Sequence, residues 1–126
     1  MAGKKVLVVD DEIHIVHVVA VKLRNNGFEV ISAGNGEEGF KLACEEKPDI
    51  IVTDYQMPIM SGMEFVEKLR ATEATRDIPV ILLTARSFAI EDKQKEDLGI
   101  SQCLSKPFSP KELLESVEDI LYARAT

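Results

Sequence analysis

The sequence predicts a doubly wound α/β domain with a five-stranded parallel sheet, and two patterns lead to this expectation. Short apolar runs rich in Val, Ile and Leu alternate five times along the chain with longer stretches of helical spacing. Most of these runs are continuous rather than interrupted by polar residues, which is typical of parallel strands buried on both faces. Parallel strands joined by helices need right-handed crossovers, so helices are expected on both faces of the sheet.

The expected strands lie at residues 6–9, 29–33, 50–53, 79–84 and 102–105. The expected helices follow them at residues 12–26, 37–46, 63–71, 88–98 and 110–123. Gly27 and Gly99 end the first and fourth helices, because glycine readily takes the left-handed conformation beyond a helix C-terminus. Pro48 limits the second helix, since the residue before a proline disfavours helical geometry. Ser109 caps the last helix, and Glu112 completes a capping box.

The composition indicates one acidic domain that comprises residues 1–126. Hydrophobic residues make up 45% of the chain and charged residues 29%, which excludes a disordered or fibrous protein. With 15 basic and 22 acidic residues the net charge is −7, and this charge disfavours direct binding to nucleic acid. No apolar run approaches the roughly 20 residues that cross a bilayer, so no membrane insertion and a cytoplasmic location are expected. Cys44 and Cys103 lie far apart in sequence and are expected to stay reduced.

Polar residues stand at the carboxyl ends of four expected strands. Asp10 and Asp11 follow the first strand, Asp54 follows the third, Thr84 ends the fourth and Lys106 follows the fifth. In such sheets these ends share one edge, where functional residues gather. Three neighbouring carboxylates repel one another, and Mg²⁺ would remove that repulsion. With one lysine and one Mg²⁺ the formal charges sum to zero, so this edge is expected to receive a phosphoryl group, with Asp54 as the nucleophile.

Four motifs carry a resemblance to a known family, and they are Asp10-Asp11-Glu12, Asp54 with Met57-Pro58 and Gly62, Thr84-Ala85, and Lys106-Pro107-Phe108. In this order and spacing they resemble the receiver domains of two-component response regulators. The resemblance covers essentially the whole chain and implies a flavodoxin-like fold with strand order 2-1-3-4-5. It also implies that Asp54 accepts a phosphoryl group from a phosphohistidine on a sensor histidine kinase or a histidine phosphotransfer protein, and that the chain then acts on a downstream target protein.

By this resemblance the bound cofactor is Mg²⁺. Asp11, Asp54 and the backbone carbonyl of Gln56 would bind the ion directly, and Asp10 would reach it through water. Gly62 is expected to serve backbone geometry rather than chemistry. The resemblance implies a signalling phosphoacceptor, which catalyses only its own phosphorylation and dephosphorylation and is not otherwise an enzyme.

The resemblance further implies a surface that changes on phosphorylation. Lys106 would pair with the phosphoryl oxygens, and Thr84 would move inward to hydrogen-bond them. Cys103 stands where many family members carry an aromatic residue. Phe88, in the loop after the fourth expected strand, is then the nearest aromatic residue. The expected switch and partner surface consists of Thr84, Ala85, Arg86, Phe88, Cys103, Pro107, Phe108, Ile15 and Val18.

The first expected helix has more apolar residues than one core stripe needs. The stripe expected to face the core consists of Ile15, Val19 and Leu23, with Val18 at its border. A second stripe at helical spacing consists of Ile13, Val16 and Ala20. This second stripe either faces water and docks on a helical phosphodonor, or belongs to a helix that is wedged broadly into the core.

Three alternatives share parts of the pattern. A small Mg²⁺-dependent phosphatase would place an acid two residues after the nucleophile Asp54, where this chain has Gln56. A flavin carrier would need a hydroxyl-rich phosphate loop after the first strand, where this chain has three acids. The third alternative is a receiver that forms part of a longer regulator with an effector domain, although no residues for one follow the last expected helix.

Overall fold

The computed structural model describes residues 3–85 and 92–123. The strands are β1 (Lys5–Val9), β2 (Glu29–Ala33), β3 (Ile50–Asp54), β4 (Val80–Ala85) and β5 (Ile100–Lys106). The helices are α1 (Ile13–Arg24), α2 (Gly36–Glu46), α3 (Gly62–Arg70), α4 (Asp92–Asp97) and α5 (Pro110–Ala123). All strand pairs are parallel, and the sheet has the order β2-β1-β3-β4-β5. The predicted fold class and strand order are therefore confirmed.

Strand and helix ends differ from the expected bounds by one or two residues, and β5 shows why. Its pairing with β4 runs from Ile100 opposite Val80 to Lys106 opposite Ala85, with a register irregularity near the start. Hydrogen bonding to a neighbouring strand thus extends β5 over polar residues that have little intrinsic preference for a strand. The expected helix at residues 88–98 is described only from Asp92, and its first part lies outside the described residues.

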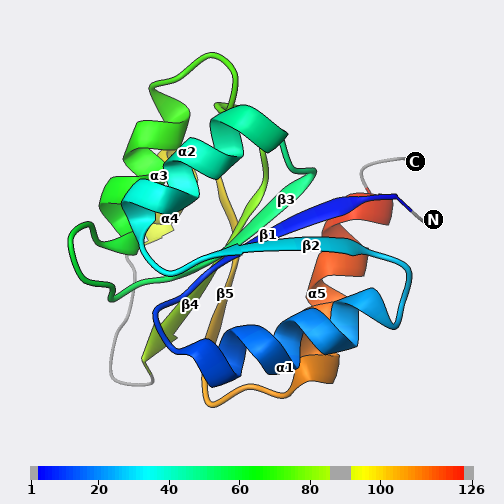
Figure 1. Ribbon diagram of the computed structural model, residues 1–126. Helices are drawn as coiled ribbons and strands as arrows, with labels where there is room; N and C mark the ends of the chain where they lie inside the picture. Colours follow the sequence, from blue (N-terminus) through cyan, green and yellow to red (C-terminus); the bar gives the residue numbers. More distant parts are fainter. Residues whose placement is uncertain (1–2, 86–91, 124–126) are drawn as a thin grey trace.

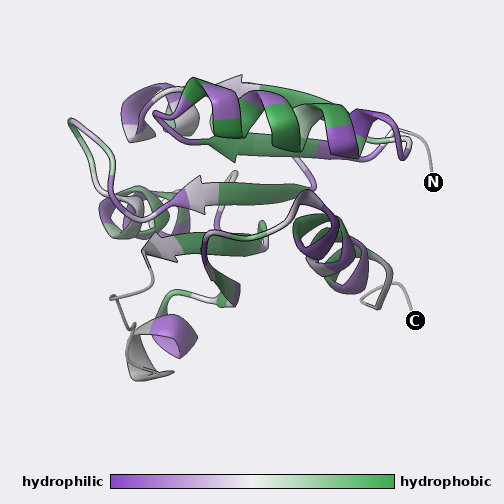
Figure 2. Cartoon of the chain, turned by 90° about the horizontal axis from the view of Figure 1, so that it is seen from below, coloured by the Kyte–Doolittle hydropathy of each residue, from purple (hydrophilic) through white to green (hydrophobic). Residues whose placement is uncertain are grey.

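Helices cover both faces of the sheet, with α1 and α5 on one face and α2, α3 and α4 on the other (Figure 1). Successive residues of a strand point to opposite faces. Val6 and Val8 of β1 therefore pack under α1 and α5, whereas Leu7 and Val9 pack under α2 and α3. Figure 2 shows that the strands are hydrophobic over most of their length, as burial on two faces requires. No helix among the described residues has the length and apolarity needed to cross a membrane.

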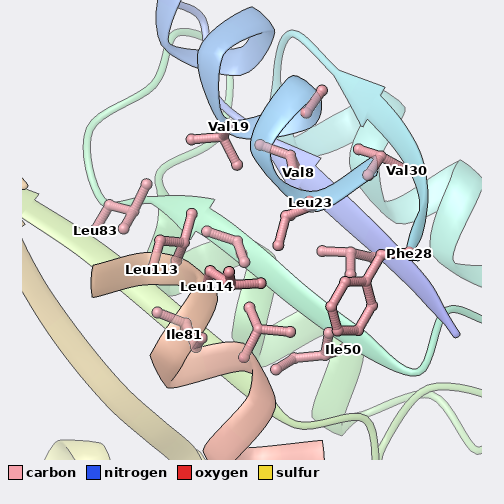
Figure 3. Close-up of a cluster of buried hydrophobic side chains, with 14 residues drawn as sticks. Val8, Val19, Leu23, Phe28, Val30, Ile50, Ile81, Leu83, Leu113 and Leu114 are labelled. Carbon is pink, nitrogen blue, oxygen red and sulfur yellow. The ribbon is translucent and has the colours of Figure 1, made fainter. Parts of the chain in front are cut away.

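The core cluster on the α1–α5 face is drawn in Figure 3. Leu23 of α1 and Leu113 of α5 meet Val8, Ile50 and Ile81 from three strands, and each of the five is at most 1% exposed. Burial of each such side chain contributes about 1.5–3 kcal/mol. This packing holds α1 and α5 against the sheet, and so it also fixes the loops that lead into them from the carboxyl ends of β1 and β5.

The second apolar stripe of α1 does not face water as a whole. Ile13 is 83% exposed, but Val16 is half-buried and Ala20 is only 4% exposed. Of the two alternatives left open by the sequence, the burial of Ala20 favours a helix that is wedged broadly into the core. The reason is that α1 contacts both α5 and β2, so its buried arc is wider than one stripe.

Gly62 lies where α3 starts against the end of β3. Ser61 and Glu64 form a capping box at this helix start, and the amide of Gly62 donates a hydrogen bond to the carbonyl of Tyr55 at 2.8 Å. A Cβ atom on residue 62 would overlap the backbone carbonyl of Asp54. The expectation that this glycine serves backbone geometry is consistent with this close approach.

We expect Gly62→Ala to lower the free energy of unfolding by about 1–3 kcal/mol, because the added methyl group meets backbone that cannot move aside cheaply. Chemical denaturation measures this change. Gly34→Ala is the matched control, since a Cβ at residue 34 meets nothing within 4 Å. Equal stability of the two variants would contradict the prediction.

Candidate functional site

The acids and the lysine that the sequence places at strand ends meet at one edge of the sheet. Asp10 directly follows β1, Asp54 ends β3 and Lys106 ends β5. The Nζ atom of Lys106 lies 3.0 Å from Oδ2 of Asp10 and 3.3 Å from Oδ1 of Asp54. Because β4 separates β3 from β5, the Lys106 side chain has to extend past the end of β4 to reach both carboxylates. One ammonium group thus joins three strands.

Glu12 completes this cluster, although its position in the motif Asp10-Asp11-Glu12 predicted no individual role for it. Its Oε1 atom lies 3.0 Å from Nζ of Lys106. The cause is local, because the backbone amide of Glu12 donates a 2.9 Å hydrogen bond to Oδ1 of Asp10. Aspartate commonly forms such a turn with the amide two residues on. The turn fixes the backbone of Glu12 close to the Asp10 carboxylate.

Asp11 lies at the margin of the acid cluster, and its role as a direct metal ligand stays a prediction. Among the described residues, the acids whose oxygens all lie within 4.8 Å of one another are Asp10, Glu12 and Asp54. Asp11 is outside this group and exposed, although it lines the same cavity. The turn at Asp10 explains the difference, since it draws the second following residue, rather than the next one, toward the acid.

An open cavity of ≈ 480 Å³ lies over Asp54. Its wall is formed by Asp11, Glu12, Asp54, Gln56, Met57, Pro58 and Lys106. The side chain of Asp54 is 9% exposed, so its carboxylate is accessible from one side only. A group that reacts with Asp54 must therefore come through this cavity.

The electrostatics of the cluster reflect one ammonium shared among three acids. Burial raises the pKa of Asp54 to about 6, the charge of Asp10 adds to the rise, and Lys106 opposes it. Burial also raises the pKa of Asp10, against hydrogen bonds from the Glu12 amide and Lys106. For Lys106 burial lowers the pKa, but Glu12, Asp10 and Asp54 outweigh burial and raise it. Lys106 therefore stays charged, and the site still has a net negative charge.

The donor atoms of this site suit a hard divalent cation. Asp10 and Asp54 offer carboxylate oxygens, and Asp11 and Gln56 line the same cavity. Oxygen donors of this kind are the ligands of Mg²⁺, which keeps several waters and binds one or two carboxylates together with phosphate. Such an ion would also offset the excess negative charge. The residues present therefore fit Mg²⁺.

Thr84 lies beside the cluster but does not line the cavity. It is 3% exposed and pairs with Ser105 in the sheet. The neighbouring residue Leu83 accepts a hydrogen bond from the Tyr55 amide, which ties the end of β4 to the residue after Asp54. Ala85 ends β4 opposite Lys106.

The residues expected to form the switch and partner surface occupy separate places. Ile15 and Val18 of α1 meet Pro107 and Phe108 in an apolar groove, defined by the lining residues Glu12, His14, Ile15, Val18, Val19, Lys106, Pro107, Phe108 and Pro110. Cys103 is half-buried on the opposite face of the sheet, on the edge strand that α4 contacts. Arg86 and Phe88 lie outside the described residues.

The fold and the site define a class of protein, namely flavodoxin-like α/β domains with an acid–lysine cluster at the carboxyl edge of a 2-1-3-4-5 sheet. Residues 6–118 match the family model of the response regulator receiver domain. The chain therefore belongs to the receiver domain family of two-component response regulators, as its motifs predicted.

Similar proteins come from several bacteria. The phosphate regulon transcriptional regulatory protein PhoB of Pseudomonas aeruginosa is 37% identical over 121 residues, which cover 96% of this chain and 53% of that protein. The alkaline phosphatase synthesis transcriptional regulatory protein PhoP of Bacillus subtilis is 40% identical over 94% of this chain and 49% of its own length. The chain thus spans about half the length of these relatives.

Among solved structures, the chemotaxis response regulator CheY4 of Vibrio cholerae superposes with a TM-score of 0.86. Its sequence is 35% identical, and the match covers 96% of this chain and 99% of that chain. The overlap therefore extends over nearly all of both chains.

The raised pKa of Asp54 predicts how pH affects stability. Between about pH 4 and pH 6 the folded protein keeps a proton on Asp54 that the unfolded chain has released, so the free energy of unfolding falls as pH rises through this window. In metal-free buffer at about pH 8, Asp54→Asn should therefore raise the melting temperature by a few degrees, or about 1 kcal/mol. This gain should shrink as pH falls toward about 4. Circular dichroism melts in chelator measure it.

Asp119→Asn is the control for this comparison, because Asp119 is exposed near the C-terminal end of α5. This substitution removes the same formal charge but leaves the repulsion among the clustered acids unchanged. A destabilised Asp54→Asn at about pH 8, or a gain that grows as pH falls, would contradict the prediction.

Proposed function

We propose that this chain is a Mg²⁺-dependent phosphoacceptor that switches a partner-binding surface. The observation that carries the proposal is the Asp54 carboxylate, which faces an open cavity while Lys106 lies 3.3 Å away. A carboxylate that is ionised near neutral pH needs no adjacent base to act as a nucleophile. The membership in the receiver family supports the same conclusion.

In the proposed reaction an Asp54 oxygen attacks the phosphorus of a phosphohistidine on a partner. A new P–O bond forms, the P–N bond breaks, and the imidazole leaves as the phosphoryl group becomes an aspartyl phosphate. Lys106 places a positive charge beside the oxygens on which negative charge develops. Hydrolysis of the aspartyl phosphate by water then restores the carboxylate.

Mg²⁺ would supply the remaining positive charge and bind the phosphoryl oxygens. Asp11, Asp54 and Gln56 line the cavity. The two carboxylates and the Gln56 backbone carbonyl would hold the ion, with Asp10 reaching it through water. The chain would otherwise act on no substrate, so its output is a change of surface. Thr84 would move toward the phosphoryl group and carry the end of β4 with it.

The proposed partners follow from the position of the groove. Ile15, Val18 and Phe108 form an apolar surface next to the cavity over Asp54, since Glu12 and Lys106 border both. A sensor histidine kinase or a histidine phosphotransfer protein that docks there would bring its phosphohistidine to Asp54. We further propose a cytoplasmic location, where such donors present their phosphohistidine, and a downstream target protein rather than direct contact with nucleic acid.

A second candidate is that the chain acts as the receiver of a longer response regulator with an effector domain. The observation that favours it is coverage, because the chain matches about half the length of PhoB and PhoP, both described as transcriptional regulatory proteins. The match to CheY4 over 99% of that chain favours a stand-alone receiver instead. The length of the native reading frame distinguishes the two.

Mass spectrometry after incubation with acetyl phosphate and Mg²⁺ tests the proposal. We expect wild type to gain the mass of one phosphoryl group and Asp54→Asn to gain none, because the acceptor oxygen is lost. Chelation of the metal should abolish the gain in wild type, since the negative charge of the acids is then not offset. Labelling of Asp54→Asn at the level of wild type, or labelling that persists in chelator, would refute the proposal.

A further inference from the structure

We propose that Glu12 is a positioning residue that holds the Lys106 ammonium in the unphosphorylated protein and competes with the incoming phosphoryl group for it. This inference rests on the proposed function of Asp54. Glu12 would thereby set how readily Asp54 is phosphorylated. Removal of its charge should speed phosphorylation rather than slow it.

The first observation is the geometry around Lys106. Its Nζ atom lies 3.0 Å from an oxygen of Glu12, as close as it lies to Asp10 and closer than it lies to Asp54 at 3.3 Å. The ammonium donates hydrogen bonds to Asp10 and Glu12, whereas its contact with Asp54 is the longer ion pair, so Asp10 and Glu12 hold it in place. A phosphoryl group on Asp54 that draws Lys106 toward itself must therefore compete with the hydrogen bonds to Asp10 and Glu12.

The second observation identifies Glu12 as the partner that can leave. The Asp10 side chain is fully buried and that of Asp54 is 9% exposed, whereas the side chain of Glu12 is 45% exposed. An exposed carboxylate regains water when it is released, so its departure costs little. Release of Asp10 would leave a buried charge without its cation, which costs far more.

The third observation is that Glu12 has a second neighbour away from the cavity. Its other oxygen, Oε2, lies 4.0 Å from Nε2 of His14, which is 80% exposed on α1. His14 lines the apolar groove, whereas Asp54 lines the cavity, and Glu12 and Lys106 are the residues common to both walls. In Figure 1 the loop between β5 and α5 runs beside the start of α1. The Glu12–Lys106 pair therefore lies between the apolar groove and the cavity over Asp54.

The charge of Glu12 also acts on the phosphodonor itself. A dianionic phosphate that enters the cavity meets Asp11, Glu12 and Asp54 against a single lysine. One unit charge a few ångströms from a dianion in a solvent-exposed cavity changes a rate by about three- to tenfold. Glu12→Gln keeps the size of the side chain, removes this repulsion and weakens the hold on Lys106.

The test is the rate of phosphorylation by acetyl phosphate at saturating Mg²⁺. We expect Glu12→Gln to react about three- to tenfold faster than wild type, and the gain to fall toward one in about 1 M KCl, where charges are screened over ~3 Å. A purely structural effect of the substitution would not depend on salt in this way. Glu115→Gln is the matched control, because it removes the same charge from an exposed position on α5, and it should react like wild type.

A second measurement separates this role from metal binding. Calorimetric titration with Mg²⁺ should give Glu12→Gln an affinity within about tenfold of wild type, because the proposed ligands Asp11, Asp54 and Gln56 remain. A larger loss would make Glu12 a metal ligand and overturn the inference. So would a phosphorylation rate at or below that of wild type. Loss of labelling in wild type itself would instead refute the proposed function of Asp54.

Discussion

The contact of the Lys106 ammonium with acids from β1 and β3 is the interaction on which the site depends. Asp10 and Asp54 are both buried, and buried carboxylates are tolerated in a folded protein only when they are paired or hydrogen-bonded. Lys106 meets this requirement for both while it spans the end of β4. The same contact leaves the cluster short of positive charge, since one cation faces three anions. In the unphosphorylated protein the site is therefore accessible and has an excess of negative charge that a bound cation would offset.

The fold contributes by bringing strand ends to fixed places. The parallel register sets Asp54 opposite Leu83 and places Lys106 opposite Ala85. The two core clusters hold α1 and α5 on one face and α2 and α3 on the other, so the loops at this edge leave from anchored elements. Gly62 adds a close approach that lets α3 start directly against the Asp54 carbonyl. The elements around Asp54 are therefore held in place by packing, although Asp54 borders an open cavity.

Much of the fold and part of the site could be predicted from the sequence, because both depend on local patterns. Continuous apolar runs mark buried parallel strands, and the polar residues at their ends mark the edge where Asp10, Asp54 and Lys106 meet. The position of Glu12 was not predictable, since it depends on a turn in which the Asp10 side chain accepts from the Glu12 amide. The sequence left open whether Ala20 faces water or the core, because its burial depends on both α5 and β2 as neighbours of α1.

The sheet divides the apolar interior into two compartments that share only its backbone. Val8 belongs to one and Leu7 to the other, so neighbouring residues of one strand pack against different helices. Substitutions that repack α1 against α5 can therefore accumulate without disturbing the layer under α2 and α3. The surface that α1 and α5 present can therefore change while the strand ends that carry Asp54 and Lys106 keep their places.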